Sequence, residues 1–244
     1  MPNSTGDMLN VYSLSEEGRL ISCMYMCTEP STGEFTIYTD WRYYSGNSLY
    51  TGEPAGPFIV KFGGFSVVLN ESEAKSEIST YASSFTKPGE LTDAYMACLT
   101  DDLNNVTMKN LMALLKVNVP EGSDIKQIDL DFYGHQRAEY DLISNSWCNY
   151  GENAKKTLSY GYAFYLDEWG GTAADVKTLA PGDYYFPVIP QTLTSTAENP
   201  CIELRFTDAV IPYTEKPGDP SLYTVKQKNG TVTFEAGKVY DLGT

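Results

Sequence analysis

The stretch IKQIDLDF, residues 125–132, decides the fold class of this chain. Apolar and polar side chains alternate along it, and this is the period of a β-strand, in which successive side chains point to opposite faces of a sheet. Leu130 and Phe132 fall on the apolar side. Asp129 and Asp131 fall on the other side, which we expect to face water.

Similar short runs recur along the whole chain, separated roughly every ten residues by turn residues such as Pro-Gly pairs. Regular spacing of this kind is typical of β-sandwiches and barrels rather than of alternating strands and helices. The sequence therefore predicts an all-β protein. The runs predicted as strands are Leu20–Cys27, Glu34–Trp41, Phe58–Leu69, Ile125–Tyr133, Asp183–Ile189, Ile202–Phe206, Thr231–Phe234 and Val239–Leu242.

Two segments also fit a helix. In residues 106–119, Met108, Leu111 and Leu115 have the spacing of an amphipathic helix, although the end of the segment alternates like a strand. Residues 72–84 contain several residues that favour helix. We expect a small helical content within a β framework.

The pair Asn229-Gly230 lies between a polar run, residues 223–228, and the predicted strand at residues 231–234. Both central positions of a two-residue hairpin need a positive φ, which Asn and Gly tolerate. The sequence therefore predicts that these two runs form a hairpin.

The charge of the chain limits its partners. Its 244 residues include 17 basic and 32 acidic residues, which give a formal net charge of −15. Such a field repels phosphate backbones and anionic membranes, so we do not expect nucleic-acid binding. Calcium or a basic partner would be tolerated, and a solvated charge that keeps the protein soluble is the simpler interpretation.

The five cysteines are scattered, and their number is odd. Cys23 and Cys27 would lie about 13 Å apart on one strand, too far for a disulfide. We interpret the cysteines as reduced core thiols. No stretch is apolar enough to span a membrane, and the polar residues 1–6 do not resemble a signal peptide, as expected of a chain from which a targeting segment was removed.

Catalytic motifs are sparse. His135 is the only histidine, which excludes zinc sites built from two or three imidazoles, and no nucleophile elbow or phosphate-binding loop occurs. We therefore predict no catalytic residue, no metal site and no cofactor.

Paired carboxylates, at Asp101-Asp102, at Asp129/Asp131 or within residues 167–169, leave a glycosidase as an alternative. The spacing of Asp129 and Asp131 also fits the start of a calcium loop, but Tyr140 stands where such a loop needs Glu.

Exposed aromatic side chains suggest another alternative, a carbohydrate-binding surface lipoprotein of a glycan-uptake system. The candidate ligand-binding aromatics are Trp41, Tyr43, Trp147 and Trp169. Aromatic rings on half-buried strands pack a core more often than they bind a ligand. The core interpretation therefore stands beside the glycan interpretation.

Two longer stretches carry a family resemblance. The first has an Asp-x-x-x-Ala strand, an apolar segment and an I-x-x-I-x-L strand, and the second has the segments IPQTL and F-x-A-G-K-x-Y-x-L. Together they resemble the fimbrillin-like (type V pilus) proteins of anaerobic, outer-membraned bacteria. The matching segments are 91–97, 106–119 and 125–130 for the first stretch, and 179–193, 202–206 and 234–242 for the second.

The resemblance implies a fold and a location. Such proteins fold as two tandem β-sandwich domains of transthyretin-like, Greek-key type. Since Asn, Ser and Gly accumulate near residues 140–153, we place the domains at 1–143 and 144–244. Such proteins are exported to the cell surface and outer membrane, where a lipid anchor, removed from this chain, would be the only membrane attachment. Their partners are other pilus subunits or host and bacterial surface ligands, with glycans among the candidates.

The resemblance also implies an assembly mechanism. Proteolysis after a basic residue removes an N-terminal strand, and a neighbouring subunit fills the vacated groove by β-augmentation. Arg19 lies in a turn just before a predicted strand and is the candidate cut point, with an ordinary solvated arginine as the alternative. The last predicted strand is a candidate donor strand or a plain edge strand, and its residues are Lys238, Val239, Tyr240, Asp241 and Leu242.

Overall fold

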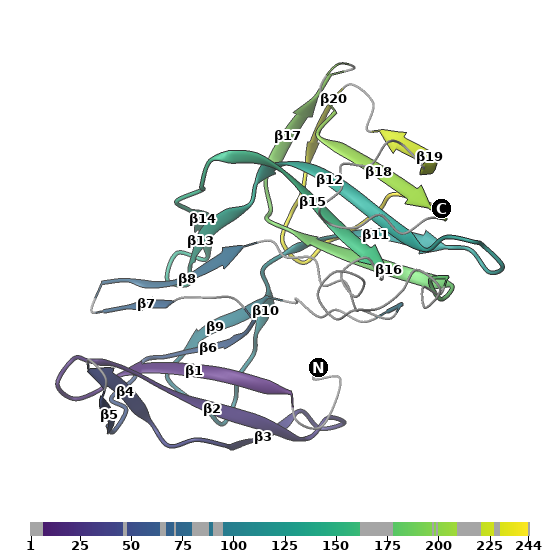
Figure 1. Cartoon of the computed structure of the whole chain (residues 1–244). Helices are drawn as coiled ribbons and strands as arrows, with labels where there is room; N and C mark the ends of the chain where they lie inside the picture. Colours follow the sequence, from purple (N-terminus) through teal and green to yellow (C-terminus); the bar gives the residue numbers. More distant parts are fainter. Residues whose placement is uncertain are drawn as a thin grey trace. The chain divides into compact units, whose positions relative to one another are not determined.

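The computed structural model describes residues 7–45, 48–63, 67–70, 72–79, 88–89, 95–161, 178–196, 198, 200–208, 221–226 and 230–243. Every regular element among them is a β-strand (Figure 1). All eight predicted runs are strands, and the run at residues 58–69 forms two of them, so the predicted all-β class is confirmed. The described residues contain no helix that is long and apolar enough to cross a membrane.

Contacts between residues divide the chain into two compact units. Unit 1 contains residues 1–79, 94–111 and 138–150, and unit 2 contains residues 80–93, 112–137 and 151–244. The boundary predicted between residues 143 and 144 falls inside the last segment of unit 1, and the tandem arrangement stays a prediction.

Unit 1 is built around an eight-stranded sheet in which β1 is an internal strand. The strand order is β10-β9-β6-β1-β2-β4-β5, and β3 also pairs with β2. The bounds are β1 Met8–Leu14, β2 Leu20–Glu29, β3 Glu34–Ile37, β4 Arg42–Ser45, β5 Ser48–Thr51, β6 Phe58–Phe62, β9 Met96–Thr100 and β10 Lys109–Asn110.

A second sheet, almost all of it in unit 1, has the order β14-β13-β8-β7. Residues 74–79 form a strand there, so the prediction of helix in this segment was wrong. Ala74, Ser76 and Ile78 are buried and alternate with less buried residues, and this period of two outweighs the helix preference of the individual residues. The bounds are β7 Val67–Leu69, β8 Ala74–Ser79, β13 Arg137–Asp141 and β14 Ser146–Cys148.

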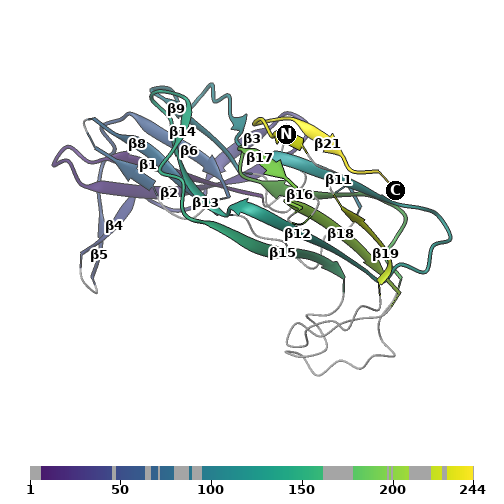
Figure 2. The same ribbon diagram turned by 90° about the horizontal axis from the view of Figure 1, so that it is seen from above.

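Unit 2 is a sandwich whose two main sheets share one core. The first sheet has the order β15-β12-β18-β19, the second has the order β16-β11-β21, and β17 pairs with β20 (Figure 2). Leu115 of β11, Phe132 of β12 and Phe186 of β16 are fully buried in the common apolar cluster. The bounds are β11 Ala113–Val119, β12 Gln127–His135, β15 Asn153–Gly161, β16 Gly182–Val188, β17 Thr192–Ser195, β18 Ile202–Thr207, β19 Ser221–Lys226, β20 Gly230–Thr233 and β21 Val239–Asp241.

Two further local predictions can be compared with these strands. The segment at residues 106–119 forms β10 and β11, so the strand alternative was right and the amphipathic helix was wrong. The predicted hairpin around Asn229-Gly230 depends on residues 227–229, which lie outside the described residues, and it stays a prediction. Among the described residues, β19 pairs with β18 and β20 pairs with β17.

Candidate functional site

The turn between β1 and β2 contains Arg19, the predicted processing residue. The Ser15 amide donates to the Arg19 carbonyl at 2.8 Å, and the Arg19 amide donates to the Ser15 hydroxyl at 3.2 Å. Gly18 adopts a φ of 74°, a left-handed conformation that glycine tolerates best. Residues 16–20 are all exposed. The peptide bond after Arg19 therefore lies in a tight turn at the surface.

The Arg19 side chain is half exposed and makes only surface contacts. Its Nε lies 3.2 Å from the Glu17 carboxylate, its Nη1 donates to the Tyr43 hydroxyl at 2.9 Å, and its guanidinium carbon lies 5.2 Å from the Tyr43 ring centroid. Contacts of this kind at the surface contribute little stability. A protease site and a solvated surface arginine both fit this geometry.

Strand β1 is held on both sides. All seven of its residues pair with β2, and residues 10–12 also pair with β6. Leu9 and Val11 are buried in one cluster with Cys23 of β2 and Val60 of β6. Burial of an aliphatic side chain of this size contributes roughly 1.5–3 kcal/mol. Loss of β1 would open a groove that has unpaired backbone groups on both walls and an apolar floor.

Lys61 of β6 lies beside β1 in the sheet. It is only 1% exposed and is the cross-strand partner of Asn10. Its Nζ lies 5.5 Å from the ring centroid of Tyr12 and has no hydrogen-bond partner among the described residues. Burial lowers the pKa of Lys61 to about 8, and the negative charge of Glu77 opposes only part of that shift.

The second candidate element is β21, which lies at the edge of its sheet (Figure 2). It pairs with β11 in parallel, and its outer edge has no partner strand within the described part of the chain. The Leu114 amide donates to the Lys238 carbonyl and the Leu242 amide donates to the Lys116 carbonyl, both at 2.9 Å. A short strand held on one side only is the easiest part of a sheet to detach.

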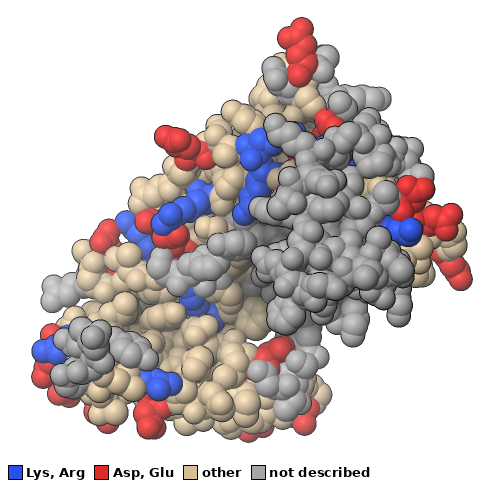
Figure 3. Space-filling view, viewed as in Figure 1, with Lys and Arg blue, Asp and Glu red and all other residues tan. Residues whose placement is uncertain are grey.

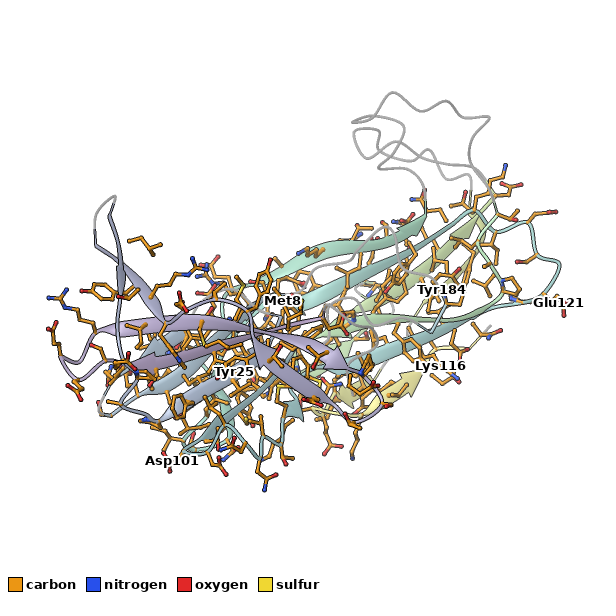
Figure 4. The ribbon with its side chains drawn as sticks, turned by 90° about the horizontal axis from the view of Figure 1, so that it is seen from below. Met8, Tyr25, Asp101, Lys116, Glu121 and Tyr184 are labelled. Atoms are coloured by element: carbon orange, nitrogen blue, oxygen red, sulfur yellow. The ribbon has the colours of Figure 1, made fainter. Side chains whose placement is uncertain are left out.

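The side chains of β21 are held by a ring contact, an ion pair and hydrogen bonds. The Tyr240 hydroxyl donates to the Thr233 carbonyl at 3.1 Å and accepts from the Glu235 amide at 2.9 Å, and Asp241 accepts from the Gly243 amide at 2.8 Å. The Tyr240 ring lies edge-on to Phe234, with 4.9 Å between the ring centroids. The Asp241 carboxylate lies 2.7 Å from Lys116 Nζ, and Lys116 lies beside the yellow strand in Figure 4. A hydrogen bond from Lys116 lowers the pKa of Asp241. Val239 is 54% exposed, so β21 covers its sheet only partly.

Two of the predicted ligand-binding aromatics belong to the large sheet or its edge. Trp41 packs on Phe58 with 5.8 Å between the ring centroids and contributes to the core cluster of that sheet. Arg19 contacts both the hydroxyl and the ring of Tyr43. The core interpretation therefore describes Trp41 better than a ligand platform does.

Trp147 lies in the second sheet of unit 1, and Trp169 lies outside the described residues. The Trp147 ring is 5.4 Å from Tyr140 and 6.5 Å from Tyr150, centroid to centroid. Its Nε1 is buried without a described hydrogen-bond partner, whereas Tyr150 is 40% exposed. The exposed part of this aromatic group is therefore Tyr150.

Asp131 of β12 is 4% exposed, so the prediction that it faces water was wrong. Arg205 donates to both of its carboxylate oxygens, at 2.9 and 3.2 Å, and Thr157 donates at 2.6 Å. Lys155 Nζ lies 2.7 Å from the same carboxylate. Burial raises the pKa of Asp131, but the bonds from Lys155 and Thr157 and the charge of Arg205 outweigh it and lower the pKa. A carboxylate stabilised in this way is not a proton donor.

Asp129 is also 4% exposed, and the same correction applies to it. Its carboxylate accepts hydrogen bonds from Ser159 at 2.6 Å and from Gln127 at 2.9 Å. Both aspartates are buried because β12 has a neighbouring strand on each side, and polar side chains of β15 and β18 close over them. The alternation predicted correctly that Asp129 and Asp131 share one side of the strand, but it did not predict that this side is buried.

The remaining chemical groups form no catalytic arrangement among the described residues. His135 is held in place, since its Nδ1 lies 2.6 Å from the Gly151 carbonyl and its amide donates to the Gln191 side chain at 2.8 Å. No group of three or more His, Cys, Asp or Glu within the described ranges could hold a metal ion. On the face seen in Figure 3, acidic side chains lie in several separate places rather than in one patch. This distribution favours the interpretation of the net charge as a solubilising one.

Comparison with known proteins gives a likeness of fold. No protein-family model matches the chain, and no curated protein matches it. A solved candidate cell adhesion protein from Bacteroides ovatus matches 98% of this chain and 82% of its own, with 10% identity and a TM-score of 0.52. Another candidate cell adhesion protein, from Bacteroides uniformis, matches 99% of this chain and 87% of its own, with 12% identity and a TM-score of 0.45. The first of these shows a similar overall fold.

Sequence reasoning found β21 and Arg19 but missed β1 and Lys61. The segment 58–62 reads FIVKF, in which a strand would turn Lys61 to the wet face. Residues 59–61 are all buried, which means that both faces of β6 are covered. No signal within the segment itself indicates the covering layer.

Proposed function

We propose that the chain is a non-enzymatic cell-surface protein of the fimbrillin-like kind, a pilus subunit or adhesin that joins further copies by β-strand exchange. One observation carries the proposal: β1 is an internal strand that is linked to the rest of its sheet through an exposed turn containing Arg19. A cut in that turn would make an internal strand replaceable.

The likeness of fold supports the cell-surface part of the proposal. The structure from Bacteroides ovatus is that of a candidate cell adhesion protein, and an adhesion protein acts outside the cell. The proposed location is the outer membrane and the fimbrium, with export as a lipoprotein. The proposed partners are other subunits and surface ligands.

The assembly step would consist of a cut and a replacement. Cleavage after Arg19 leaves β1 attached only by hydrogen bonds and packing to β2 and β6. Its departure vacates a groove with two unpaired walls, which an extended segment of a second copy can fill by main-chain hydrogen bonds. The donor in this proposal is the segment 238–242, because β21 is an edge strand with an exposed outer side.

The buried carboxylates support a non-enzymatic role. A glycosidase needs one carboxylic acid with a raised pKa and a second carboxylate across the scissile bond. Asp131 has the opposite property, a lowered pKa with its oxygens paired to Arg205, Lys155 and Thr157. Of the other acidic pairs considered, Asp101 and Asp102 are exposed, and residues 167–168 lie outside the described residues.

Size-exclusion chromatography with light scattering, before and after an arginine-specific protease, tests the proposal. The sequence has four arginines, of which Arg19 and Arg137 are exposed, so the cleavage products are easily assigned by mass. We expect a cut at Arg19 and conversion of the monomer into dimers or longer assemblies.

Two variants serve as matched controls. Arg137→Gln should still be cut at Arg19 and should still assemble, whereas Arg19→Gln should do neither. A chain that resists cleavage at Arg19, or one that stays monomeric after the cut, contradicts the assembly proposal.

A second candidate function is carbohydrate binding, favoured by the exposed ring of Tyr150 beside Trp147. The neighbouring Asn149 side chain donates to Glu139 at 2.6 Å, which places polar groups next to the rings, an arrangement suited to a sugar. A glycan array tests this function. Binding that Tyr150→Ala abolishes and Tyr133→Ala leaves unchanged would establish it, and an array without any signal would exclude it for the glycans on the array.

A further inference from the structure

Lys61 is the least satisfied charged group in the described part of the chain. It is 1% exposed, and its Nζ has no hydrogen-bond partner. Burying an ammonium group away from water is costly unless a counter-charge or hydrogen bonds compensate for it. The Tyr12 ring, 5.5 Å away, offers a cation–π contact, which replaces only part of the lost hydration.

The groups around Lys61 point to strand β1. Asn10 and Tyr12 of β1 lie on the same side of the sheet as Lys61, since Asn10 is its cross-strand partner and Tyr12 is two residues further on. On the other side of β6, Ala97 of β9 is the cross-strand partner of Lys61 and offers no polar group. The negative charge of Glu77 in β8 acts on Lys61 without forming a hydrogen bond to its Nζ. Asn10 and Tyr12, the neighbours of Lys61 on β1, thus belong to the strand that the proposed cut would release.

Side chains alternate between the two faces of a strand, and this alternation decides which residues of a replacing strand would face Lys61. In β1, Leu9 and Val11 point into the apolar cluster, and the alternate residues share the side of Lys61. In the segment 239–242, Tyr240 and Leu242 pack on the apolar core of unit 2. A segment 239–242 that buries Tyr240 and Leu242 in the vacated groove therefore turns Asp241 to the side of Lys61, whether Tyr240 takes the place of Leu9 or of Val11.

We propose that Lys61 determines the specificity of the groove, by forming a buried ion pair with Asp241 from the segment 239–242 of a second copy. This inference rests on the proposed strand exchange and adds to it the residue pair that selects the incoming strand. A segment with an apolar or neutral residue at the position of Asp241 would leave Lys61 unpaired and would bind less well.

The exchange of partners favours this pair. In the free chain Asp241 is bound to Lys116, and the side chains of Asp241 and Lys116 are 57% and 24% exposed, so water replaces that contact at little cost. Once the incoming strand covers Lys61, the same carboxylate would give its ammonium group the hydrogen-bond partner that it lacks when β1 is in place. An ion pair gains more where the surroundings exclude water.

A peptide exchange experiment tests the inference on the chain cut at Arg19. The probe is a fluorescent peptide of residues 236–244, and its binding is followed by anisotropy. A labelled peptide of residues 7–19, the chain's own strand, is the control that shows that the groove can be refilled. The peptide with Asp241→Asn is compared with the unchanged peptide on two proteins, the cut wild type and the cut Lys61→Met variant.

We expect Asp241→Asn to weaken binding to the wild type at least tenfold and to leave binding to Lys61→Met almost unchanged, because the pair is then already broken. Equal binding of both peptides to the wild type, or an equal loss on both proteins, overturns the role of Lys61 and leaves strand exchange in place. If the own-strand peptide binds and the 236–244 peptide does not, both the donor and the pair are wrong. If neither peptide binds, strand exchange itself is wrong. Lys61→Gln replaces Lys61→Met if the latter does not fold.

Discussion

Both units bury a charged side chain on an internal strand, Asp131 in β12 of unit 2 and Lys61 in β6 of unit 1. Asp131 is bound by Arg205, Lys155 and Thr157. Lys61 has an aromatic ring nearby but no hydrogen-bond partner. The exposed fractions of the two residues differ by only a few per cent, whereas their partners differ completely.

This difference separates a buried charge that stabilises its own fold from a buried charge that lacks hydrogen-bond partners. A buried charge with all its partners in its own fold locks neighbouring strands together, as Asp131 does for β12, β15 and β18. A buried charge without partners destabilises the free chain, and such a cost is expected where a residue serves another state of the protein. The comparison predicts opposite signs for substitutions at the two places.

The largest effect is expected for Arg205→Met. The change leaves Asp131 buried with one of its two cationic partners gone, and breaking a buried pair from one side costs about 3–5 kcal/mol. Urea unfolding at pH 7 measures the loss. Lys155→Met is the matched control, since the Lys155 side chain is 61% exposed and should matter much less. Equal losses for the two variants would show that the network does not depend on burial.

The next largest effect is expected for Lys61→Met, with the opposite sign. Methionine fills about the same space without a charge, so the uncut chain should become more stable by about 2–3 kcal/mol. Thermal and urea unfolding of the uncut chain give the value. A destabilised Lys61→Met variant would mean that Lys61 is satisfied by its surroundings, and the contrast with Asp131 would then disappear.

The same residue predicts a dependence of stability on pH. The pKa of Lys61 is about 8 in the folded chain and 10.5 in its ordinary range, so between these values the unfolded chain binds more protons than the folded chain. Stability therefore rises with pH in this window, by about 1–2 kcal/mol between pH 8 and 9.5, whereas below pH 8 the penalty is complete. Subtracting the pH profile of the unfolding free energy of Lys61→Met from that of the wild type removes the contribution of the tyrosines and cysteines. A flat difference profile would contradict the lowered pKa.

The smallest effect is expected for Asp241→Asn in the free chain. The variant loses an ion pair between Lys116 and an exposed carboxylate, so the melting temperature should hardly change. In the cut chain the same substitution should weaken assembly clearly. A variant that melts early would make β21 a structural element of its own unit rather than a transferable strand.

The alternation of residues predicted the all-β class and the strands of eight runs, but not β1. The eight runs became strands, and the pattern in residues 125–132 placed Leu130 in the core and Asp131 on the opposite side. It did not reveal that neighbouring strands close over Asp131, because Arg205 comes from a strand distant in the sequence. The helix prediction failed at residues 74–79 for the same reason, since the pairing of β8 is a tertiary property.

The candidate site was predictable to the extent that it is local. Arg19 stands in a turn that Gly18 marks in the sequence, and the Val239–Leu242 run alternates clearly. Lys61 could not be found in this way, because a lysine in a strand normally faces water. Only the layers on both faces of β6 make it unusual.

The chain passes between its two compact units at five points, after residues 79, 93, 111, 137 and 150. A single genetic crossover can therefore exchange neither unit for that of another protein, and one near residue 143 would also separate β13 from its partner β14. Diversification of such a protein is then expected to proceed through surface substitutions and strand termini rather than through shuffling of whole units.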